Sequence, residues 1–323
     1  MKLASYRFGG RESFGLIRGE GIVDLGRRFA GVRDLKALIA GGFEALSGIG
    51  DDEPVDLSFD EVEFLPVISN PGAIFCVGLN TKSHFDEIEE TLGSYPVKPE
   101  RPWLFMRTAR AQVGHGVPLE RPNGSPLFDY EGEIAIIIGK PGRFVDKNDA
   151  LDHVAGYSCF NDGSIRDFQL HSPLFTAGKN FPRSGGFGPW LATPDEVGPI
   201  ESLRLKTRVN GRLVQDMPYA DLMFGFPELI SYISYFTELQ PGDVIVTGSA
   251  EGVGILRQPP LMLQAGDVCE VEVAGIGVLR NPVVDAQGPN RAPVDRDDVG
   301  EAILASFGKM PKARASVSLG EEA

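Results

Sequence analysis

The stretch Glu131-Gly-Glu-Ile-Ala-Ile-Ile-Ile138 has the pattern of a buried β-strand that begins with two carboxylates. Its second half is a run of β-branched residues ended by a glycine, which is typical of a strand. Strand side chains alternate between faces, so Glu131 and Glu133 share a face with Ala135 and Ile137. Two carboxylates at the edge of an apolar face repel each other and lose hydration, unless a cation joins them. The alternative is a half-exposed strand with solvated glutamates, and the spacing alone leaves both open.

A third carboxylate comes from the next acidic motif, Asn-Asp-Gly-Ser-Ile-Arg-Asp, in which Asp162 is the second residue. With Glu131 and Glu133 it would offer three oxygen donors, and no Cys or His stands beside them in the sequence. Oxygen donors without nitrogen or sulfur suit a hard cation. The three residues therefore indicate a site for Mg²⁺ or Mn²⁺.

Composition places the chain among ordinary globular proteins, with 323 residues, 42% hydrophobic and 24% charged. A net charge of −14 argues against a nucleic-acid partner and against an anionic membrane. No apolar run approaches the roughly 18–20 residues that span a bilayer, and no signal peptide is expected from the charged N-terminal residues. The 3 cysteines form no Cys-x-x-Cys motif and predict buried thiols in a reducing compartment. We therefore expect a cytoplasmic protein.

The first 68 residues predict a small β-rich unit. Strand patterns occur in Lys2–Phe8, Phe14–Arg18 and Gly21–Asp24, and a helix pattern occurs near Val32–Ala40. The acidic segment Asp51–Glu63 that follows is typical of a solvated connector.

Residues 69–285 predict a second, larger unit in which short strands alternate with Gly/Pro turns. Residues 286–323 predict a flexible tail with one short helix, 299–307. The elements expected inside the larger unit are a hairpin of Leu203–Val209 and Leu213–Asp216 around Asn210-Gly211, a helix over Pro227–Glu238, and strands over Asp243–Thr247 and Val268–Val273.

Nucleotide, serine-hydrolase and zinc sites are weakly supported by the motifs. The glycine clusters lack the Gly-x-Gly-x-x-Gly spacing and the P-loop pattern, the sequence around Ser158 fails the Gly-x-Ser-x-Gly pattern at its last position, and the 4 histidines form no metal-spaced pair. His84 and Glu87 lie one helical turn apart, so they could touch and orient the imidazole as a base, although an exposed histidine is the alternative.

Six motifs in order make the chain resemble the fumarylacetoacetate hydrolase family over roughly residues 70–284. They are Gly78-Leu79-Asn80 with His84 and Glu87; Glu131 and Glu133; Asn161, Asp162, Ser164, Arg166, Asp167 and Gln169; Gly178-Lys179; Phe187-Gly188-Pro189-Trp190; and Gly242-Asp243 with Thr247-Gly248-Ser249 and Gly252-Val253-Gly254.

The resemblance implies a mostly β (α+β) fold, a mixed β-roll or distorted barrel-like sandwich with few helices, preceded by a small β-rich N-terminal domain. It also implies a homodimer and a small anionic oxo-acid substrate. The implied reaction is metal-dependent cleavage of a C–C bond in an acylpyruvate or other 1,3-diketo acid through a metal-stabilised enolate, in the catabolism of aromatic or organic acids. The alternatives are isomerisation of a 2-hydroxydienedioate, decarboxylation of a 2-oxo diacid, or sugar-acid dehydration at the same metal site.

The resemblance assigns roles residue by residue. Glu131, Glu133 and Asp162 would hold the metal, and Lys179, His84 and Glu87 would be catalytic. Arg166, Gln169, Thr247, Gly248 and Ser249 would bind substrate. Three of these roles keep an alternative, because Arg166 could be an ion-pair partner, Ser249 a strand-end cap and Lys179 a surface lysine.

Two positions depart from the family pattern, and the pocket walls are a separate expectation. Ser249 stands where threonine is common and keeps the hydroxyl, and Arg107 stands where lysine is common and is expected at the mouth of the site. The walls of the pocket are expected from the loops 91–102 and 182–186.

Overall fold

The computed structural model describes residues 1–50, 52–92 and 98–288 of the chain. Its strands are β1 (Lys2–Phe8), β2 (Arg11–Arg18), β3 (Gly21–Asp24), β4 (Leu57–Ser58), β5 (Glu63–Phe64), β6 (Ile74–Gly78), β7 (Trp103–Met106), β8 (Gln112–Val113), β9 (Leu119–Arg121), β10 (Phe128–Asp129), β11 (Gly132–Ile138), β12 (Val154–Asn161), β13 (Ser164–Ile165), β14 (Gly185–Ala192), β15 (Arg204–Val209), β16 (Arg212–Pro218), β17 (Val244–Val246), β18 (Val268–Val273) and β19 (Gly277–Asp285). Its α-helices are α1 (Leu25–Arg28), α2 (Leu35–Gly41), α3 (Lys82–Leu92), α4 (Arg166–Gln169), α5 (Thr176–Lys179), α6 (Pro194–Val197) and α7 (Phe226–Phe236).

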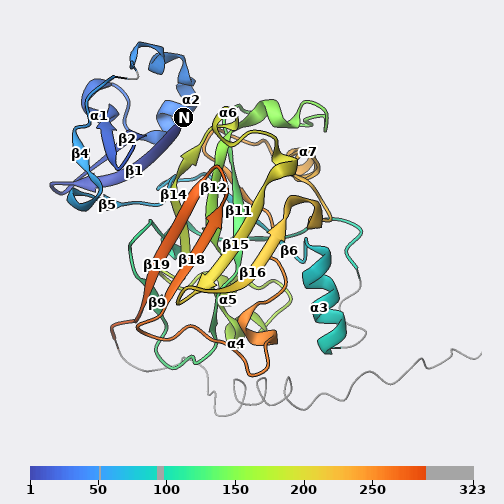
Figure 1. The fold of residues 1–323 in the computed structure, drawn as a ribbon. Helices are drawn as coiled ribbons and strands as arrows, with labels where there is room; N and C mark the ends of the chain where they lie inside the picture. The colour runs from blue at the N-terminus through green and yellow to red at the C-terminus, as the bar shows by residue number, and fades with distance from the viewer. Residues whose placement is uncertain (51, 93–97, 289–323) are drawn as a thin grey trace, which may run out of the picture.

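Two sheets stack to form the body of the molecule. The larger has 12 strands, ordered β4-β3-β2-β1-β14-β12-β11-β17-β6-β7, with β5 added at β1 and β8 at β14. A 5-stranded sheet, β16-β15-β18-β19-β9, packs on the central strands β11, β12 and β14, and Figure 1 shows its strands β15, β16, β18 and β19 in yellow and orange in front of them. The predicted mostly β, sandwich-like fold with few helices is confirmed.

The strand β11 lies at the centre of the large sheet and contributes to both hydrophobic cores. Its even-numbered residues Ile134, Ile136 and Ile138 pack in the core between the two sheets. Its odd-numbered residues Ala135 and Ile137 pack in the opposite core, which includes side chains of the N-terminal strands. This alternation places Glu131 and Glu133 on the face of Ala135 and Ile137, as the sequence predicted, and that face points away from the 5-stranded sheet.

Most predicted elements are present, with ends that differ by a few residues. The hairpin of β15 and β16 has positive φ at both Asn210 and Gly211, which is the signature of the predicted type I′ turn. The helix α2 begins three residues later than predicted, because the Asp34 side chain caps it by accepting from Ala37 N at 2.8 Å. The helix α7 ends at Phe236, two residues before the predicted end.

The interpretation of residues 51–63 as a solvated connector is wrong for the residues that the structure describes. The strands β4 and β5 lie within and just after this segment and pair with β3 and β1. Leu57 is buried, and Asp56 accepts from the backbone N–H of Asp24 at 2.7 Å and pairs with Arg28. The acidic residues therefore sit on a segment that extends the sheet, and their charges are partly neutralised by arginine.

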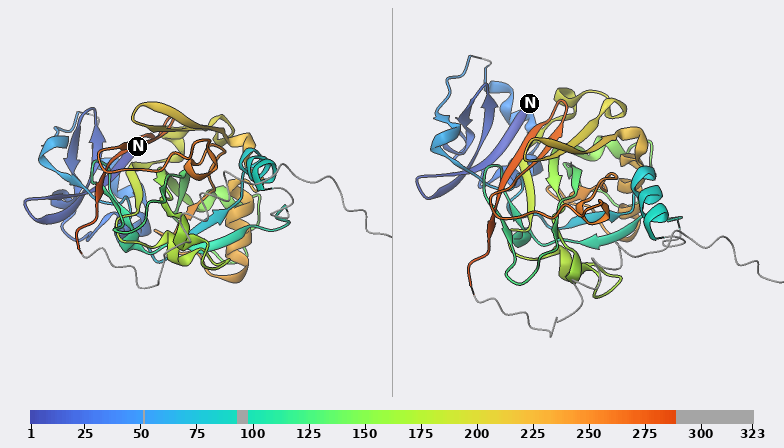
Figure 2. Two further views of the ribbon diagram at one scale, coloured as in Figure 1. Left: turned by 90° about the horizontal axis from the view of Figure 1, so that it is seen from below. Right: turned by 60° about the horizontal axis from the view of Figure 1, so that its bottom comes forward.

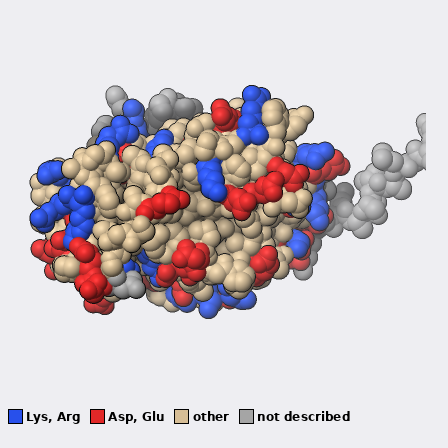
Figure 3. Space-filling view, turned by 90° about the horizontal axis from the view of Figure 1, so that it is seen from above, with Lys and Arg blue, Asp and Glu red and all other residues tan. Residues whose placement is uncertain are grey.

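The N-terminal strands lie at one side of the molecule and α3 at the other (Figure 2). The predicted boundary at residue 68 falls between β5 and β6, and β1 continues the large sheet by pairing with β14 at Lys2–Ala192 and Leu3–Leu191. Acidic and basic side chains are interspersed on the face shown in Figure 3. Of the described helices, none is long and apolar enough to cross a membrane. The predicted tail and its helix lie outside the described residues.

Candidate active site

Three buried carboxylates meet at the start of β11. Glu131 and Glu133 flank the first residue of the strand, and Asp162 directly follows β12, which pairs with β11 through Gly132 and Asn161. The backbone N–H of Asp162 donates to the carbonyl of Glu131 at 2.8 Å, which fixes the two segments together. Oxygen atoms of the three carboxylates lie within 4.8 Å of one another. The solvated-glutamate alternative is therefore excluded, because Glu131, Glu133 and Asp162 are at most 6% exposed.

The charge distribution leaves Glu133 in an unfavourable setting. Burial, reinforced by the charges of Asp162 and Glu131, raises the pKa of Glu133 well above its usual range. Its carboxylate accepts one hydrogen bond, from the backbone N–H of Gly248. A cation shared by the three carboxylates would relieve this repulsion, and an all-oxygen donor set fits a hard divalent ion. The residues present therefore fit the Mg²⁺ or Mn²⁺ site that the sequence predicted.

Lys179 is fully buried against the same carboxylates rather than on the surface. Its Nζ lies 2.5 Å from Glu131 Oε2 and 2.6 Å from Asp162 Oδ2. Burial disfavours the ammonium, but Asp162 and Glu131 outweigh it and raise the pKa of Lys179. The preceding Gly178 allows this placement, because a Cβ there would lie 2.4 Å from the backbone nitrogen of Gln169. Lys179 is thus a fixed positive charge beside the predicted metal ligands.

The sequence suggested that Arg107 lies at the mouth of the site. The structure instead places it behind Asp162. Both side chains are buried, and the Arg107 guanidinium pairs with Asp162 Oδ1. It also donates to Ser184 Oγ at 2.8 Å and to the carbonyl of Gly163 at 3.0 Å. Arg107 thus holds one carboxylate oxygen of Asp162, and Lys179 holds the other.

Arg166 was expected either to bind substrate or to be an ion-pair partner of an acid, and the structure shows the ion pairs. Its guanidinium lies between Asp129 and Glu131, with Nη2 at 2.8 Å and 2.7 Å from their oxygens, and Nη1 donates to Gln169 Oε1 at 2.8 Å. Burial favours the neutral acid, but Arg166 and Lys179 hold the pKa of Glu131 well below its usual range. Arg166 therefore keeps Glu131 ionised and orients it.

Asp129 is a site residue that the sequence reasoning missed. It accepts from the backbone N–H groups of Gly254 at 2.7 Å and Ile255 at 3.0 Å, and it pairs with Arg166. The sequence did contain a signal for it: Asp129 lies two residues before Glu131, so it continues the every-second-residue spacing of the two glutamates. Asp129 ties the loop after β17 to the charged centre of the site.

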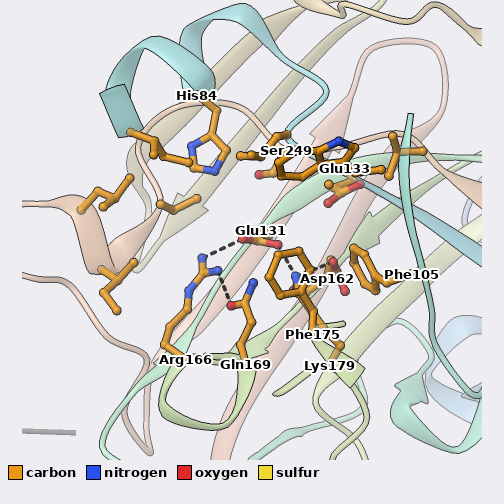
Figure 4. A pocket seen from close by; sticks show the side chains of 18 of the residues that line it. His84, Phe105, Glu131, Glu133, Asp162, Arg166, Gln169, Phe175, Lys179 and Ser249 are labelled. Atoms are coloured by element: carbon orange, nitrogen blue, oxygen red, sulfur yellow. Dashed lines mark hydrogen bonds and ion pairs between the residues drawn. The ribbon is translucent and has the colours of Figure 1, made fainter. Parts of the chain in front are cut away.

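His84 and Glu87 touch on α3, as their spacing predicted. His84 Nδ1 lies 2.9 Å from Glu87 Oε2, and Glu87 Oε1 accepts from the backbone N–H of Gly252 at 2.8 Å. A carboxylate can only accept, so in the neutral imidazole this contact places the proton on Nδ1 and the lone pair on Nε2. Figure 4 shows the imidazole pointing into the cavity, across from Lys179 and Arg166. His84 is only 8% exposed, so it is not the exposed histidine of the alternative.

The loop after β17 contributes Ser249 to the cavity but not Thr247 or Gly248. The Thr247 hydroxyl donates to the carbonyl of Ile134 at 3.0 Å, which secures the loop to β11. Gly248 supplies the N–H that reaches Glu133. Ser249 Oγ accepts from Gln215 Nε2 at 2.8 Å, so its own proton can point to a ligand oxygen. Gln215, which also accepts from Gly132 N at 2.9 Å, was not foreseen from the sequence.

The three carboxylates, Lys179, Arg166, His84 and Ser249 share one cavity of about 180 Å³ (Figure 4). The expected wall-forming loops contribute none of their described residues, and the walls come instead from β6 and the turn after it, α3, β7, the α4–α5 segment and the loop after β17. The cavity is lined by Val77, Gly78, Leu79, His84, Ile88, Trp103, Phe105, Glu131, Glu133, Asp162, Arg166, Gln169, Leu170, Phe175, Lys179, Ser249, Val253, Ile255 and Leu256.

Comparison with known proteins agrees with this geometry. The sequence is 38% identical over 230 residues to the mitochondrial oxaloacetate tautomerase fahd2 of Xenopus laevis, covering 71% of this chain and 70% of that protein. The fold matches the fumarylacetoacetate hydrolase of the psychrophile Exiguobacterium antarcticum, with a TM-score of 0.75, 32% identity, and coverage of 88% of this chain and 100% of that chain.

A second solved structure resembles the fold in a ligand-bound form. It is the maleylpyruvate hydrolase of Sphingobium sp. SYK-6 in complex with manganese(II) ion and pyruvate, with a TM-score of 0.70, 25% identity, and coverage of 89% of this chain and 100% of that chain.

The family profile described as fumarylacetoacetate (FAA) hydrolase, C-terminal, matches residues 73–284, which include every lining residue of the cavity. The chain therefore belongs to the fumarylacetoacetate hydrolase family of metal-dependent enzymes.

Proposed function

We propose that this chain is a divalent-cation-dependent tautomerase of 2-oxo acids, which moves a proton between carbon 3 and the 2-oxo oxygen. The observation that carries the proposal is the juxtaposition of two groups in one cavity. A cluster of three buried carboxylates with Lys179 lies on one side, and the His84–Glu87 pair lies on the other. The similarity to an oxaloacetate tautomerase supports it.

The carboxylate cluster is the place where substrate oxygens would bind. Glu131, Glu133 and Asp162 would hold the cation, which supplies Lewis acidity toward the substrate carboxylate and 2-oxo oxygen. Lys179 adds a fixed positive charge beside those oxygens, and Ser249 offers a hydroxyl proton. Negative charge that develops on the 2-oxo oxygen is thus stabilised by groups already in place.

The proton transfer falls to His84. Its Nε2 takes a proton from carbon 3, the C–H electron pair forms the C2–C3 double bond, and the proton returns to the oxygen to give the enol. Glu87 holds the ring by its Nδ1–H and stabilises the imidazolium that forms in between.

A second candidate is hydrolysis of a C–C bond in an acylpyruvate, and the same His84–Glu87 pair favours it. The oriented imidazole could instead take a proton from water, and hydroxide would add to the carbon-4 carbonyl. The C3–C4 bond would then break, its electron pair would leave as the enolate of pyruvate, and carbon 3 would receive the proton. The products would be pyruvate and one carboxylic acid, which distinguishes this reaction from tautomerisation.

The test is product analysis with added Mg²⁺ or Mn²⁺. Oxaloacetate and acetylpyruvate are offered to wild type, His84→Gln and, as a control on the same helix, Glu89→Gln. Interconversion of the keto and enol forms without carbon-fragment release, lost in His84→Gln only, supports the tautomerase. Acetate and pyruvate from acetylpyruvate would assign the hydrolase, and no change in either substrate would overturn both candidates.

A further inference from the structure

Gln215 is a buried amide that joins the two sheets behind the cavity. It lies on β16 of the 5-stranded sheet and is 2% exposed. Its Oε1 accepts from the backbone N–H of Gly132 at 2.9 Å, between the two glutamates of β11. Its Nε2 donates to Ser249 Oγ at 2.8 Å and to the carbonyl of Ala250 at 2.9 Å. One side chain thus connects the strand of the carboxylate cluster to the loop after β17.

The amide of Gln215 can take only one orientation. A backbone N–H can only donate and a backbone carbonyl can only accept. If the amide were flipped, its NH₂ group would face the Gly132 N–H and its oxygen would face the Ala250 carbonyl, so both bonds would be lost. The NH₂ group therefore stays on the side of Ser249 and donates to the hydroxyl oxygen.

This orientation makes the Ser249 hydroxyl a donor toward the cavity. The NH₂ group of Gln215 has no lone pair to offer, so the Ser249 proton cannot point back to it. In the described part of the chain the hydroxyl makes no other hydrogen bond, and the backbone carbonyl of Ser249 is itself held by Thr81 Oγ1 at 2.6 Å. Ser249 lines the cavity together with the three carboxylates (Figure 4). Its proton is thus free for an oxygen of a bound ligand.

We infer that Gln215 is a positioning residue, which sets the Ser249 hydroxyl as a hydrogen-bond donor to a substrate oxygen. The inference rests on the proposed binding of 2-oxo acid oxygens at the carboxylate cluster. Gln215 does not line the cavity, so its effect on a ligand passes either through Ser249 or through β11. Without the amide the hydroxyl can rotate, and a bound ligand must then order it at a cost in affinity.

A double-mutant cycle on ligand binding tests the inference. The ligand is oxalate, a small dianion that chelates a divalent cation and offers acceptor oxygens without reacting, and calorimetry measures its affinity for the Mn²⁺-loaded protein. Ser249→Ala and Gln215→Met are each expected to weaken oxalate binding about tenfold, as for one hydrogen bond to a charged group. Together they should also weaken it only about tenfold, because no hydroxyl is left to position. Independent losses that multiply to about 100-fold, or no loss in Ser249→Ala, would overturn the inference.

Two further variants keep the cycle decisive. Gln112→Met removes another buried amide, on β8, which neither bonds to Ser249 nor lines the cavity, so any effect it has should be independent of Ser249→Ala. If Gln215→Met does not fold, Gln215→Glu replaces it. The carboxylate keeps the bond from the Gly132 N–H but can only accept at Ser249, so it draws the hydroxyl proton away from the ligand. The loss should then be larger in wild type than in the Ser249→Ala background, and equal losses would contradict the role of Gln215.

Cation affinity and turnover separate this inference from the proposed function. The affinity for Mn²⁺ alone is measured in each variant, because Gln215 also holds Gly132 between two of the predicted metal ligands. If weaker Mn²⁺ binding were the only change in Gln215→Met, the effect would pass through β11 and the inference would be overturned. Coupled losses of oxalate affinity, with no reaction of oxaloacetate or acetylpyruvate, would overturn the proposed function and leave the role of Gln215 supported. Turnover with independent losses of oxalate affinity would do the reverse.

Discussion

Glu133 is buried at the centre of like charges, and its setting differs from that of its neighbour Glu131. Glu131 is paired with Arg166 and Lys179, whereas Glu133 accepts a single N–H from Gly248. Burial raises the pKa of both glutamates, but Arg166 and Lys179 outweigh it at Glu131, whereas the charges of Asp162 and Glu131 add to it at Glu133, so the two pKa values shift in opposite directions.

The substitution Glu133→Gln should separate metal binding from folding. Glutamine keeps an acceptor for Gly248 N–H and removes the repelled charge, so we expect the metal-free variant to unfold at a temperature equal to or above that of wild type. Wild type should gain about 3 kcal/mol when Mn²⁺ is at 100 times its Kd, and the variant should gain almost none. Thermal unfolding with and without Mn²⁺ measures both, and Glu251→Gln, at an exposed residue outside the cavity, is the control. A variant that is destabilised without metal yet still stabilised by Mn²⁺ would contradict this account.

At the scale of single residues, the sequence predicted the groups that carry chemistry better than the groups that position them. The alternation along β11 was enough to put Glu131 and Glu133 together, and the one-turn spacing was enough to pair His84 with Glu87. Arg107 and Asp129 could not be placed, because their partners are distant in the chain and only the fold brings them together.

Among the elements, β11 depends on the glycine between its two glutamates. A Cβ at Gly132 would lie 2.0 Å from Thr207 Oγ1 on β15, because this residue faces the 5-stranded sheet. Any side chain there would push β11 away from β15 and move both glutamates. The Glu-Gly-Glu pattern therefore has a packing reason as well as a chemical one.

A double-mutant cycle tests this contact. Gly132→Ala should cost about 3 kcal/mol of unfolding free energy from overpacking. Thr207→Ala should cost little, since the Thr207 hydroxyl is buried with no hydrogen-bond partner among the described residues. The double mutant should recover most of the unfolding free energy that Gly132→Ala loses. Without the Thr207 hydroxyl, the nearest atoms to the new Cβ are Thr207 Cβ and Leu205 Cδ2, both 3.3 Å away. Urea denaturation gives the four free energies, and additive losses would show that the crowding lies elsewhere.

The helix α3 is held over the cavity by the second oxygen of Glu87. Glu87→Ala removes both the His84 contact and the bond to Gly252 N, so we expect faster hydrogen exchange in α3 and a kcat lowered about 10- to 100-fold. Glu89→Ala, at an exposed residue of the same helix, should change neither. Mass spectrometry of hydrogen exchange reports the first effect and steady-state kinetics the second. Unchanged exchange with a full loss of activity would mean that Glu87 acts on His84 alone.

Local patterns located most elements but not their ends or their pairing. The Asn210-Gly211 turn and the strand alternation are set by neighbouring residues, so the sequence predicts them well. The misread segment 51–63 shows the limit, because its short strands are stabilised by pairing with β3 and β1 and its acidic composition masked them. The cavity walls were misplaced for a similar reason, since segments distant from one another in the chain build them.

Across the whole molecule, the N-terminal strands and the larger unit share one hydrophobic core. Leu3, Phe14 and Leu16 belong to the same buried cluster as Ala135 and Ile137 of β11. We therefore expect one cooperative unfolding transition for the described parts of the chain, despite the domain boundary that the sequence suggests at residue 68. Differential scanning calorimetry of the metal-free protein checks this. Two separate transitions, with calorimetric and van't Hoff enthalpies that disagree, would show that the two units fold independently.

The central claim is that Glu131, Glu133 and Asp162 hold a cation at which a 2-oxo acid loses a proton from carbon 3 to His84. The most direct measurement is exchange of the carbon-3 hydrogens of 2-oxoheptanoate in D₂O, followed by NMR with and without Mg²⁺. We predict rapid exchange with wild type and Mg²⁺, loss of that exchange on chelation of the cation, and at least a roughly 100-fold slower rate in His84→Gln. Exchange that needs no cation, or that His84→Gln leaves unchanged, would contradict the account.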